Sequence, residues 1–541
     1  MEIIAANMAP VMFVCMILML LIGYPVAFTL AAHGLLFFML GVFVAPFSGG
    51  EITLSMPLLY ALPDRFWGTM SNETLLAIPF FTFMGIILER SGMAEDLLET
   101  IGQLFGRVRG GLAYAVIIVG ALLAATTGVV AASVIAMGLI SLPIMMRYGY
   151  NRRISSGAIA AAGTLAQIIP PSIVLIVLAD QLDRSVGDMY AGALLPGLML
   201  TGLYCLYVMA TTIFRPQSLP ALPEEVRTLG SGVASLFALI AIGIAIAWGA
   251  YVYLEPAHGN DADIWGAAIG IVAVYLITVA DRGLGTGMTS RLAQQVVFVL
   301  VPPLALIFLV LGTIFLGIAT PTEGGAMGAV GALVMAIGKR RLDFRLMHQA
   351  LINTAKLCSF VMFILIGARV FSLTFYGVNG HLWVEHLLRH LADSETGFLV
   401  TVSLLIFVLA FFLDFFELAF IIVPLLAPVA ENMGIDLIWF GVILAINMQT
   451  SFMHPPFGFA LFYLRSVAAR VPYIDKITGE TIQPVDTRDI YWGAAPFVII
   501  QVLMVAVTIL VPQIVMHYKT ETTVIKEEAI DDILQNLGGQ N

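Results

Sequence analysis

Long uncharged segments alternate with short basic loops along most of the chain. Seven segments of 26 to 37 residues contain no Asp, Glu, Lys or Arg: 110–146, 154–179, 189–214, 228–254, 292–322, 437–464 and 490–516. A helix that crosses a bilayer needs about 20 apolar residues, so each segment predicts at least one transmembrane helix. None shows the roughly ten-residue alternation of a membrane barrel. The pattern therefore predicts an all-α polytopic membrane protein.

Composition supports this class and excludes others. Of the 541 residues, 60% are apolar and only 11% are charged, whereas a soluble domain carries about 25% charged residues. The net charge of −10 comes partly from the last 25 residues, which we interpret as a solvated acidic tail. Nothing in the charge pattern supports nucleic-acid binding, and the expected surroundings are the lipid bilayer.

One uncharged segment is too long for a single crossing. Segment 110–146 has 37 residues, yet basic loops flank both of its ends. It is therefore predicted to enter and leave on the same side as a re-entrant hairpin, with its turn near Thr126, Thr127 and Gly128. Segment 397–430, interrupted at 413–417, is predicted to form a second hairpin from the opposite side. Non-helical backbone at membrane depth is tolerated only where protein or water surrounds it.

Basic residues set the predicted orientation in a bacterial inner membrane. With two re-entrant hairpins and an external N-terminus, most of the 25 Lys and Arg residues fall on one side. The positive-inside rule makes that side the cytoplasm. The N- and C-termini are then predicted to be periplasmic.

The two halves of the chain repeat a pattern of prolines and glycines. The same intervals of 6 and 21 residues separate Pro143, Gly149 and Pro170 in one half and Pro428, Gly434 and Pro455 in the other. Because the hairpins open to opposite sides, the predicted repeat is inverted. The predicted division is a first repeat 1–215 (hairpin 110–146, broken helix 154–180), a cytoplasmic segment with two inserted transmembrane helices 216–291, a second repeat 292–516 (hairpin 397–430, broken helix 437–465), and an acidic tail 517–541.

Paired breaks in corresponding helices predict a transport site. A proline pair frees backbone carbonyls and leaves helix ends near the membrane midplane, and such interruptions mark binding sites in transporters. Sodium prefers oxygen ligands, which carbonyl, hydroxyl and carboxylate groups supply. The candidate sodium ligands are Thr126, Thr127, Gly128, Gln167, Pro170, Ser172, Gly317, Thr320, Thr322, Asp414, Thr450, Ser451 and Pro455. The candidate substrate-adjacent residues are Glu323, Glu417, Asn447 and Arg369.

Structural alternatives remain open for these residues. A proline pair also kinks a packed helix without any ligand, and polar residues can hydrogen-bond neighbouring helices. Glu323 follows a Thr-Pro-Thr break, where it would cap a new helix. Asp414 would also be tolerated at the periplasmic rim of the membrane.

Four strings give the chain a family resemblance. They are Gly-Ile-Ala-Thr-Pro-Thr-Glu at 317–323, Gly-Thr-Leu-Ala-Gln-Ile-Ile-Pro-Pro-Ser at 163–172, Ala-Gly-Ala-Leu-Leu-Pro-Gly at 191–197 and Asn-Met-Gln-Thr-Ser-Phe-Met-His-Pro-Pro at 447–456. With these strings the chain resembles the large permease subunit (DctM type) of the tripartite ATP-independent periplasmic (TRAP) transporters. One departure is the first hairpin tip, Thr-Thr-Gly, which reads Ser-Gly-Ser-like in many members.

The resemblance implies partners, a coupling ion and a mechanism. Such permeases work with a periplasmic substrate-binding protein (P type) and a small four-helix membrane subunit (Q type). They import small organic acids, commonly carboxylates, with sodium as the coupling ion, and no other cofactor is expected. Their fold is similar to that of divalent-anion/sodium symporters, with an elevator-type moving domain. Since the first predicted helix begins at about Met8, the small subunit is expected to be a separate chain.

Two further classes were weighed against this one. An autonomous sodium/dicarboxylate symporter of the related fold would need no partner proteins, and neighbouring genes would distinguish it. An intramembrane enzyme would need a catalytic constellation, but the chain has no His-Glu-x-x-His or Gly-x-Ser-x-Gly string. The sequence therefore predicts a transporter rather than an enzyme.

Overall fold

The computed structural model describes residues 5–519 except 129, 231, 286, 392–393, 412, 457 and 476, and only the backbone of 126, 127, 257, 258, 260 and 391. In the first part of the chain the helices are α2 (Met8–Leu21), α3 (Val26–Val44), α4 (Leu62–Met70), α5 (Ala77–Arg90), α6 (Met93–Leu104), α7 (Gly111–Thr127), α8 (Val130–Arg147), α9 (Arg152–Thr164), α10 (Ile173–Gln181) and α11 (Val186–Phe214). Then follow α12 (Val233–His258) and α13 (Ala262–Leu284).

The later part of the chain is equally helical. Its helices are α14 (Arg291–Phe315), α15 (Pro321–Gly338), α16 (Phe344–Gly377), α17 (Gly380–Leu391), α18 (Glu395–Leu409), α19 (Phe415–Glu417), α20 (Val423–Asn432), α21 (Leu437–Ser451), α22 (Phe459–Val467), α23 (Thr487–Leu510) and α24 (Gln513–Met516). Short helical turns are η1 (Ala45–Phe47), η2 (Met56–Ala61), η3 (Thr74–Leu76), η4 (Leu165–Gln167), η5 (Pro216–Ser218), η6 (Glu224–Val226), η7 (Gly259–Asp261) and the π-helix η8 (Leu418–Ile422).

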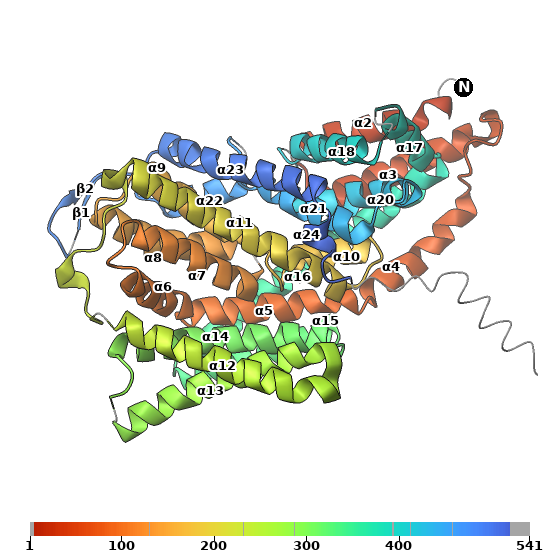
Figure 1. Ribbon diagram of the computed structural model, residues 1–541. Coiled ribbons are helices and arrows are strands. Elements are labelled where there is room, and N and C mark those ends of the chain that lie inside the picture. Colours follow the sequence, from red (N-terminus) through yellow and green to blue (C-terminus); the bar gives the residue numbers. More distant parts are fainter. Residues whose placement is uncertain are drawn as a thin grey trace, which may run out of the picture.

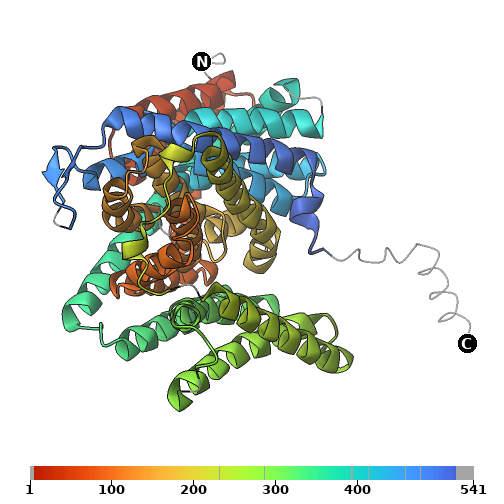
Figure 2. The same cartoon turned by 60° about the vertical axis from the view of Figure 1, so that its left-hand side comes forward.

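These helices make a multi-pass membrane protein. Within the described residues nine helices are long and apolar enough to cross a bilayer, or up to eleven if each sharply bent pair counts as one span. The inserted helices α12 and α13 pack against each other and on α14, and they lie at one side of the molecule (Figures 1 and 2). Their aromatic side chains face outward, since Trp248 and Tyr253 are 68% and 84% exposed. Such exposure fits contact with lipid.

The first hairpin consists of α7 and α8, which meet at Gly128. Gly128 has a positive φ of 58°, a conformation that glycine adopts without steric cost. A Cβ atom at this position would also lie 3.2 Å from the Cγ1 atom of Ile173. The turn of the hairpin therefore depends on glycine for both its conformation and its close packing on α10.

The second hairpin consists of α18 and a continuous helical segment from Phe415 to Asn432. This segment contains α19, η8 and α20. Figure 1 shows α18, α17 and α20 at the end of the molecule opposite to β1, β2 and α6. The two hairpins thus belong to opposite ends of the helical body.

Each hairpin lies beside a helix that is broken at a proline pair. Helix α9 continues through η4 to Gln167, and α10 begins only at Ile173 after Pro170-Pro171. Helix α21 ends at Ser451, and α22 begins at Phe459 after Pro455-Pro456. Proline has no backbone N–H and clashes with a preceding helical turn, which favours a break at each pair. Each proline pair has a cis peptide bond.

The helices form two groups by their packing. Helices α7 and α8 pack on α9, α22 packs on α8, and α23 packs along α9. The last contact is very close, because a Cβ atom on Gly157 would lie 2.0 Å from the carbonyl oxygen of Gly493. In the other group α16 packs along α3 and α5, and α15 packs along α5.

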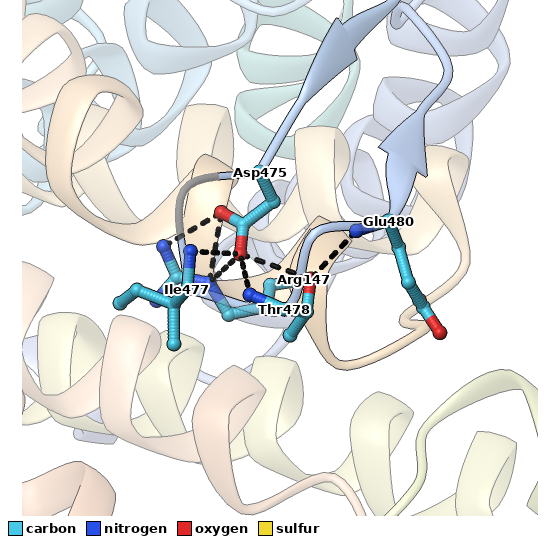
Figure 3. Close-up of polar contacts among 5 residues, drawn as sticks. All are labelled: Arg147, Asp475, Ile477, Thr478 and Glu480. Carbon is cyan, nitrogen blue, oxygen red and sulfur yellow. Dashed lines mark hydrogen bonds and ion pairs between the residues drawn. The ribbon is translucent and has the colours of Figure 1, made fainter.

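A short β-hairpin that the all-helical prediction did not include follows α22. Strands β1 (Tyr473–Ile474) and β2 (Thr481–Ile482) pair antiparallel. Between them, the Asp475 carboxylate accepts hydrogen bonds from Arg147 at the end of α8 and from the backbone N–H groups of Ile477 and Thr478 (Figure 3). The Arg147 Nη2 to Asp475 Oδ1 distance is 2.9 Å. This contact ties the first hairpin to the loop between α22 and α23.

The predicted acidic tail lies almost entirely outside the described residues, which end at Lys519. The ammonium group of Lys519 forms an ion pair with Asp436 at the start of α21.

Candidate functional site

The tips of both hairpins and both helix breaks meet at one cavity of about 280 Å³. Gly128 and Asp414 line it from the two hairpin tips, and Gln167 lines it from the first break. Leu357 and Phe360 line it from α16. Three residues that the sequence predicted from separate segments therefore lie together.

Four helical segments begin at this cavity. Val130 of α8, Ile173 of α10, Phe415 of the 415–432 segment and Phe459 of α22 are each the first residue of their segment, and each lines the cavity. The first N–H groups of a helix lack intrahelical partners and carry a partial positive charge. These N-termini would add positive potential to the cavity, whereas Asp414, which caps one of them, adds a carboxyl group. No Lys or Arg is found among the described residues that line the cavity.

Gln167 has an unsatisfied amide. Its side chain is 1% exposed, and neither Oε1 nor Nε2 has a hydrogen-bond partner among the residues that the structure describes. Its backbone carbonyl accepts a 2.8 Å hydrogen bond from the Ser172 hydroxyl, which closes the first break. An unsatisfied buried polar group costs roughly 1–3 kcal/mol. This cost would be relieved by a ligand in the cavity, such as a cation at Oε1.

The tip of the second hairpin carries two carboxylates. Asp414 Oδ1 accepts from the Glu417 N–H at 2.9 Å, and Glu417 Oε2 accepts from the Asp414 N–H at 2.9 Å. Glu417 is 8% exposed. In the described part of the chain neither carboxylate forms a salt bridge with a basic side chain. The tip therefore holds two acidic side chains without a basic partner among the described residues, an arrangement that would suit a bound cation.

The polar residues before the second proline pair are buried and hydrogen-bonded. The Thr450 hydroxyl donates to the carbonyl of Asn447 at 2.6 Å, and the Ser451 hydroxyl donates to the carbonyl of Met448. Asn447 Nδ2 donates to the Ser403 carbonyl at 2.7 Å, which joins α21 to α18. Both hydroxyl oxygens keep lone pairs, whereas Asn447 has a packing role between two helices. Pro170 and Pro455 stand in the breaks and do not belong to the cavity lining.

The predicted break at 317–323 is not part of this cavity. Gly317, Thr320 and Glu323 are exposed, and the Thr322 hydroxyl donates to the Glu73 carbonyl at 2.5 Å. Thr320 and Glu323 form a capping box at the start of α15. The helix start is therefore stabilised by its own cap and by the η3 loop, and these residues do not join the hairpin tips.

Arg369 also lies away from the cavity. Its side chain is exposed on α16, and it interacts electrostatically with Asp180 at the end of α10. Its contact with a substrate in the cavity is therefore not supported. The side chains of Thr126 and Thr127, also predicted as ligands, lie outside the described residues.

Sequence reasoning missed two groups of residues at the site. The first is a set of aromatic side chains that line the cavity: Phe360, Phe415, Phe416, Phe452, Phe459 and Tyr463. Phe415 lies inside the predicted hairpin tip and Phe452 inside the predicted helix break, so their positions in the sequence could have marked them as site residues. Phe360 is one of 34 phenylalanines and lies on a separate helix, so its position alone carried no such signal.

The second group is a buried hydrogen-bond network beside the breaks. Gln449 Nε2 of α21 donates to the Thr164 hydroxyl of α9 at 3.1 Å, and Gln501 Nε2 of α23 donates to the Tyr204 hydroxyl of α11 at 2.9 Å. This network joins both broken helices to their neighbours. It holds the two breaks in a fixed relative position.

Discontinuous helices, paired re-entrant hairpins and a cavity at their tips define a secondary-transporter type of membrane protein. The chain belongs to the DctM component family of the tripartite ATP-independent periplasmic transporters, whose family model matches residues 13–514. It is therefore a large permease subunit of this transporter class and not an enzyme.

Individual relatives agree with this family, and a solved structure supports the fold. The C4-dicarboxylate TRAP transporter large permease protein DctM of Pseudomonas aeruginosa is 29% identical over 75% of this chain and 80% of its own length. The 2,3-diketo-L-gulonate TRAP transporter large permease protein YiaN of Escherichia coli is 25% identical over 86% of this chain and 91% of its own. The crystal structure of the Alcanivorax borkumensis YdaH transporter, at 15% identity, covers 89% of this chain with a TM-score of 0.51 and supports the fold.

Proposed function

We propose that this permease imports a small organic acid, through the cavity at the hairpin tips, together with sodium ions. The observation that supports this most is that four helical segments begin at one cavity. The described lining of this cavity contains no Lys or Arg. Helix N-termini attract an anion without holding it as tightly as a fixed cation would. Such a site suits an acid that must bind and then leave.

Two sodium sites are proposed, one at each hairpin tip. At the first, Gly128, Gln167 Oε1 and the Ser172 oxygen provide ligands, with the carbonyl of Pro170 and the threonines of the tip. At the second, Asp414, Thr450, Ser451 and the carbonyl of Pro455 provide them. Two observations support these positions: the acidic side chains Asp414 and Glu417 lie together at the tip, and the Gln167 amide has no hydrogen-bond partner among the described residues. Each bound sodium ion would also attract the carboxylate of the substrate.

An elevator movement is proposed to carry the cavity across the membrane. The moving body would contain the hairpins, the broken helices, α11 and α23, which pack together. The group of α3, α5, α15 and α16 would remain still. The cavity lies at the boundary, because Leu357 and Phe360 line it from α16. A displacement of one body along the other would then open it to either side.

Two cysteine pairs test this movement. Asn72 Nδ2, before α5, donates to Asp180 Oδ1 on α10 at 2.5 Å, so the pair N72C/D180C joins the two proposed bodies. Arg153 of α9 and Asp489 of α23 form a 3.1 Å ion pair inside the proposed moving body. Cross-linking N72C/D180C should stop uptake until the disulfide is reduced, whereas cross-linking R153C/D489C should leave uptake intact. Full uptake with N72C/D180C cross-linked would contradict the elevator.

The proposed partners are a periplasmic substrate-binding protein and a small four-helix membrane subunit. Membership of the tripartite family supports both partners. Proteoliposomes that hold this chain alone should show little uptake under a sodium gradient. Addition of the small subunit and the loaded binding protein should restore uptake, and replacement of sodium by potassium should abolish it. Strong uptake by the chain alone would identify an autonomous symporter, and uptake without sodium would contradict the coupling.

A further inference from the structure

The lining of the cavity is rich in aromatic side chains. Six of its fourteen described lining residues carry aromatic rings. Two of them are not buried in the protein core, because Phe360 is 45% exposed and Phe459 is 40% exposed. Rings that line a cavity and keep exposed surface have contact area left for a ligand.

The rings form two groups that come from different elements. Phe360, Phe415 and Phe416 form the first group, with centroids 5.9 Å apart for Phe360 and Phe416 and 4.2 Å apart for Phe415 and Phe416. Phe452 and Phe459 form the second, with centroids 5.8 Å apart. Aromatic pairs prefer offset or edge-to-face contacts at such distances. A flat apolar body between the groups would extend both sets of contacts.

Polar side chains make up a small part of the lining. Among the described lining residues, those with polar side chains are Gln167, Asp414 and Tyr463. Helix N-termini and bound sodium would receive one carboxylate, whereas a second carboxylate would find only the neutral donors Gln167 and Tyr463 beside Asp414 and the rings. Burial of an unpaired charge against apolar groups is strongly unfavourable. A dicarboxylate or a polyhydroxylated acid is therefore poorly matched to this surface.

We propose that the acid carried by this chain is an aromatic monocarboxylate, or one with a similarly flat apolar body. This inference rests on the proposed function of the same cavity. The C4-dicarboxylate and diketogulonate permeases to which the chain is similar are named for more polar acids. The aromatic walls would then give this chain a different specificity within the same fold.

Binding of defined acids to the full chain, co-purified with its small subunit in nanodiscs and saturated with sodium, tests the proposal. Benzoate and phenylacetate, followed by thermal unfolding, should bind at least about tenfold more tightly than succinate or gluconate. F360L and F459L should each weaken phenylacetate binding by about three- to tenfold. The control F363L, on the same helix but packed against Phe28 and outside the cavity lining, should leave binding unchanged.

The outcomes distinguish the aromatic specificity from the proposed transport of an organic acid through the cavity. Tighter binding of succinate, or equal phenylacetate binding by F360L, F459L and the wild type, would overturn the aromatic specificity and leave organic-acid transport intact. Failure of every acid to bind in sodium would instead contradict the proposed function of the cavity. If either variant does not fold, binding of two acids to the wild type tests the proposal. Benzoate should then bind several-fold more tightly than the non-planar cyclohexanecarboxylate, and equal binding would overturn the aromatic specificity.

Discussion

Asp414 and Glu417 cap each other at the tip of the second hairpin, each accepting the backbone N–H of the other at 2.9 Å. This reciprocal cap starts the helical segment that borders the cavity. It also concentrates two carboxylates where the proposed second sodium ion would lie. The arrangement therefore combines a structural role with an electrostatic one, and these roles can be separated by mutation.

Asp414→Asn should keep the cap and lose the charge, because asparagine is an equally good capping residue. We expect the sodium concentration for half-maximal uptake to rise about tenfold, which corresponds to about 1.4 kcal/mol. This concentration is measured from the sodium dependence of uptake in proteoliposomes. Glu395→Gln, which removes an exposed carboxylate at the start of α18, is the control. An unchanged sodium requirement in Asp414→Asn would mean that the tip carboxylate serves only the fold.

Gln167→Leu should separate ligand binding from stability. Since the Gln167 amide has no partner in the described part of the chain, its replacement by leucine should not lower the melting temperature without sodium. The stabilisation by added sodium should disappear. Gln449→Leu, by contrast, breaks the bond to Thr164 and should destabilise the protein by roughly 1–3 kcal/mol with or without sodium. A sodium-induced melting shift that survives in Gln167→Leu would remove this residue from the first site.

The Arg147–Asp475 contact should make the loop between α22 and α23 sensitive to acid. The Arg147 guanidinium, with the N–H groups of Thr478 and Ile477, holds the pKa of Asp475 well below its usual value (Figure 3). The ionised form is therefore favoured in the folded loop. Its stabilisation is complete above the usual pKa of about 4 and is lost as the pH falls through the lowered value.

Asp475→Asn should accordingly speed proteolysis of residues 470–486 at pH 7. Below about pH 4 the difference in thermal stability between this variant and the wild type should shrink. Glu480→Gln, which changes an exposed carboxylate of the same loop, is the control. A difference that stays constant from pH 7 to pH 3 would show that the charge of Asp475 contributes nothing.

Single cysteines should report the predicted orientation. Cysteines at positions 152 and 340 should react with a membrane-impermeant maleimide only from the cytoplasmic side, and one at 259 only from the periplasm. Arg340 and Gly259 are exposed and Arg152 is partly exposed, so each is open to the reagent. External labelling of position 152 would contradict the re-entrant path of the first hairpin.

The close contact between α9 and α23 should not tolerate a larger residue. Gly157→Ala would place a methyl group 2.0 Å from the Gly493 carbonyl oxygen, so the helices would have to separate. We expect a loss of about 1–3 kcal/mol or more in stability, measured by thermal unfolding of the purified protein. Gly202→Ala on α11, where a Cβ atom meets nothing within 4 Å, should be neutral or slightly stabilising. Equal melting temperatures for both variants would contradict this packing.

The sequence alone determined the features that depend on chain length and local chemistry. A 37-residue uncharged segment exceeds one membrane crossing, so a turn was needed, and Gly128 provides it. Proline removes a backbone donor, so the pairs at 170–171 and 455–456 marked candidate helix breaks, whereas the pair Pro302-Pro303 lies inside the continuous helix α14. Gln167 and Asp414 were predicted as ligands from these segments, and both line the cavity.

Only the tertiary structure decided which of these features share a site. Segment 317–323 contains a Thr-Pro sequence like that of a binding break. Its polar groups, however, form the cap of α15 and a hydrogen bond to the Glu73 carbonyl, away from the cavity. Phe360 reaches the cavity because α16 packs beside the hairpin tips, a contact between residues far apart in the chain. Local patterns fix where a helix starts, bends or turns, because those energies arise between sequence neighbours. The shape and specificity of a cavity arise between helices whose separation no local pattern encodes.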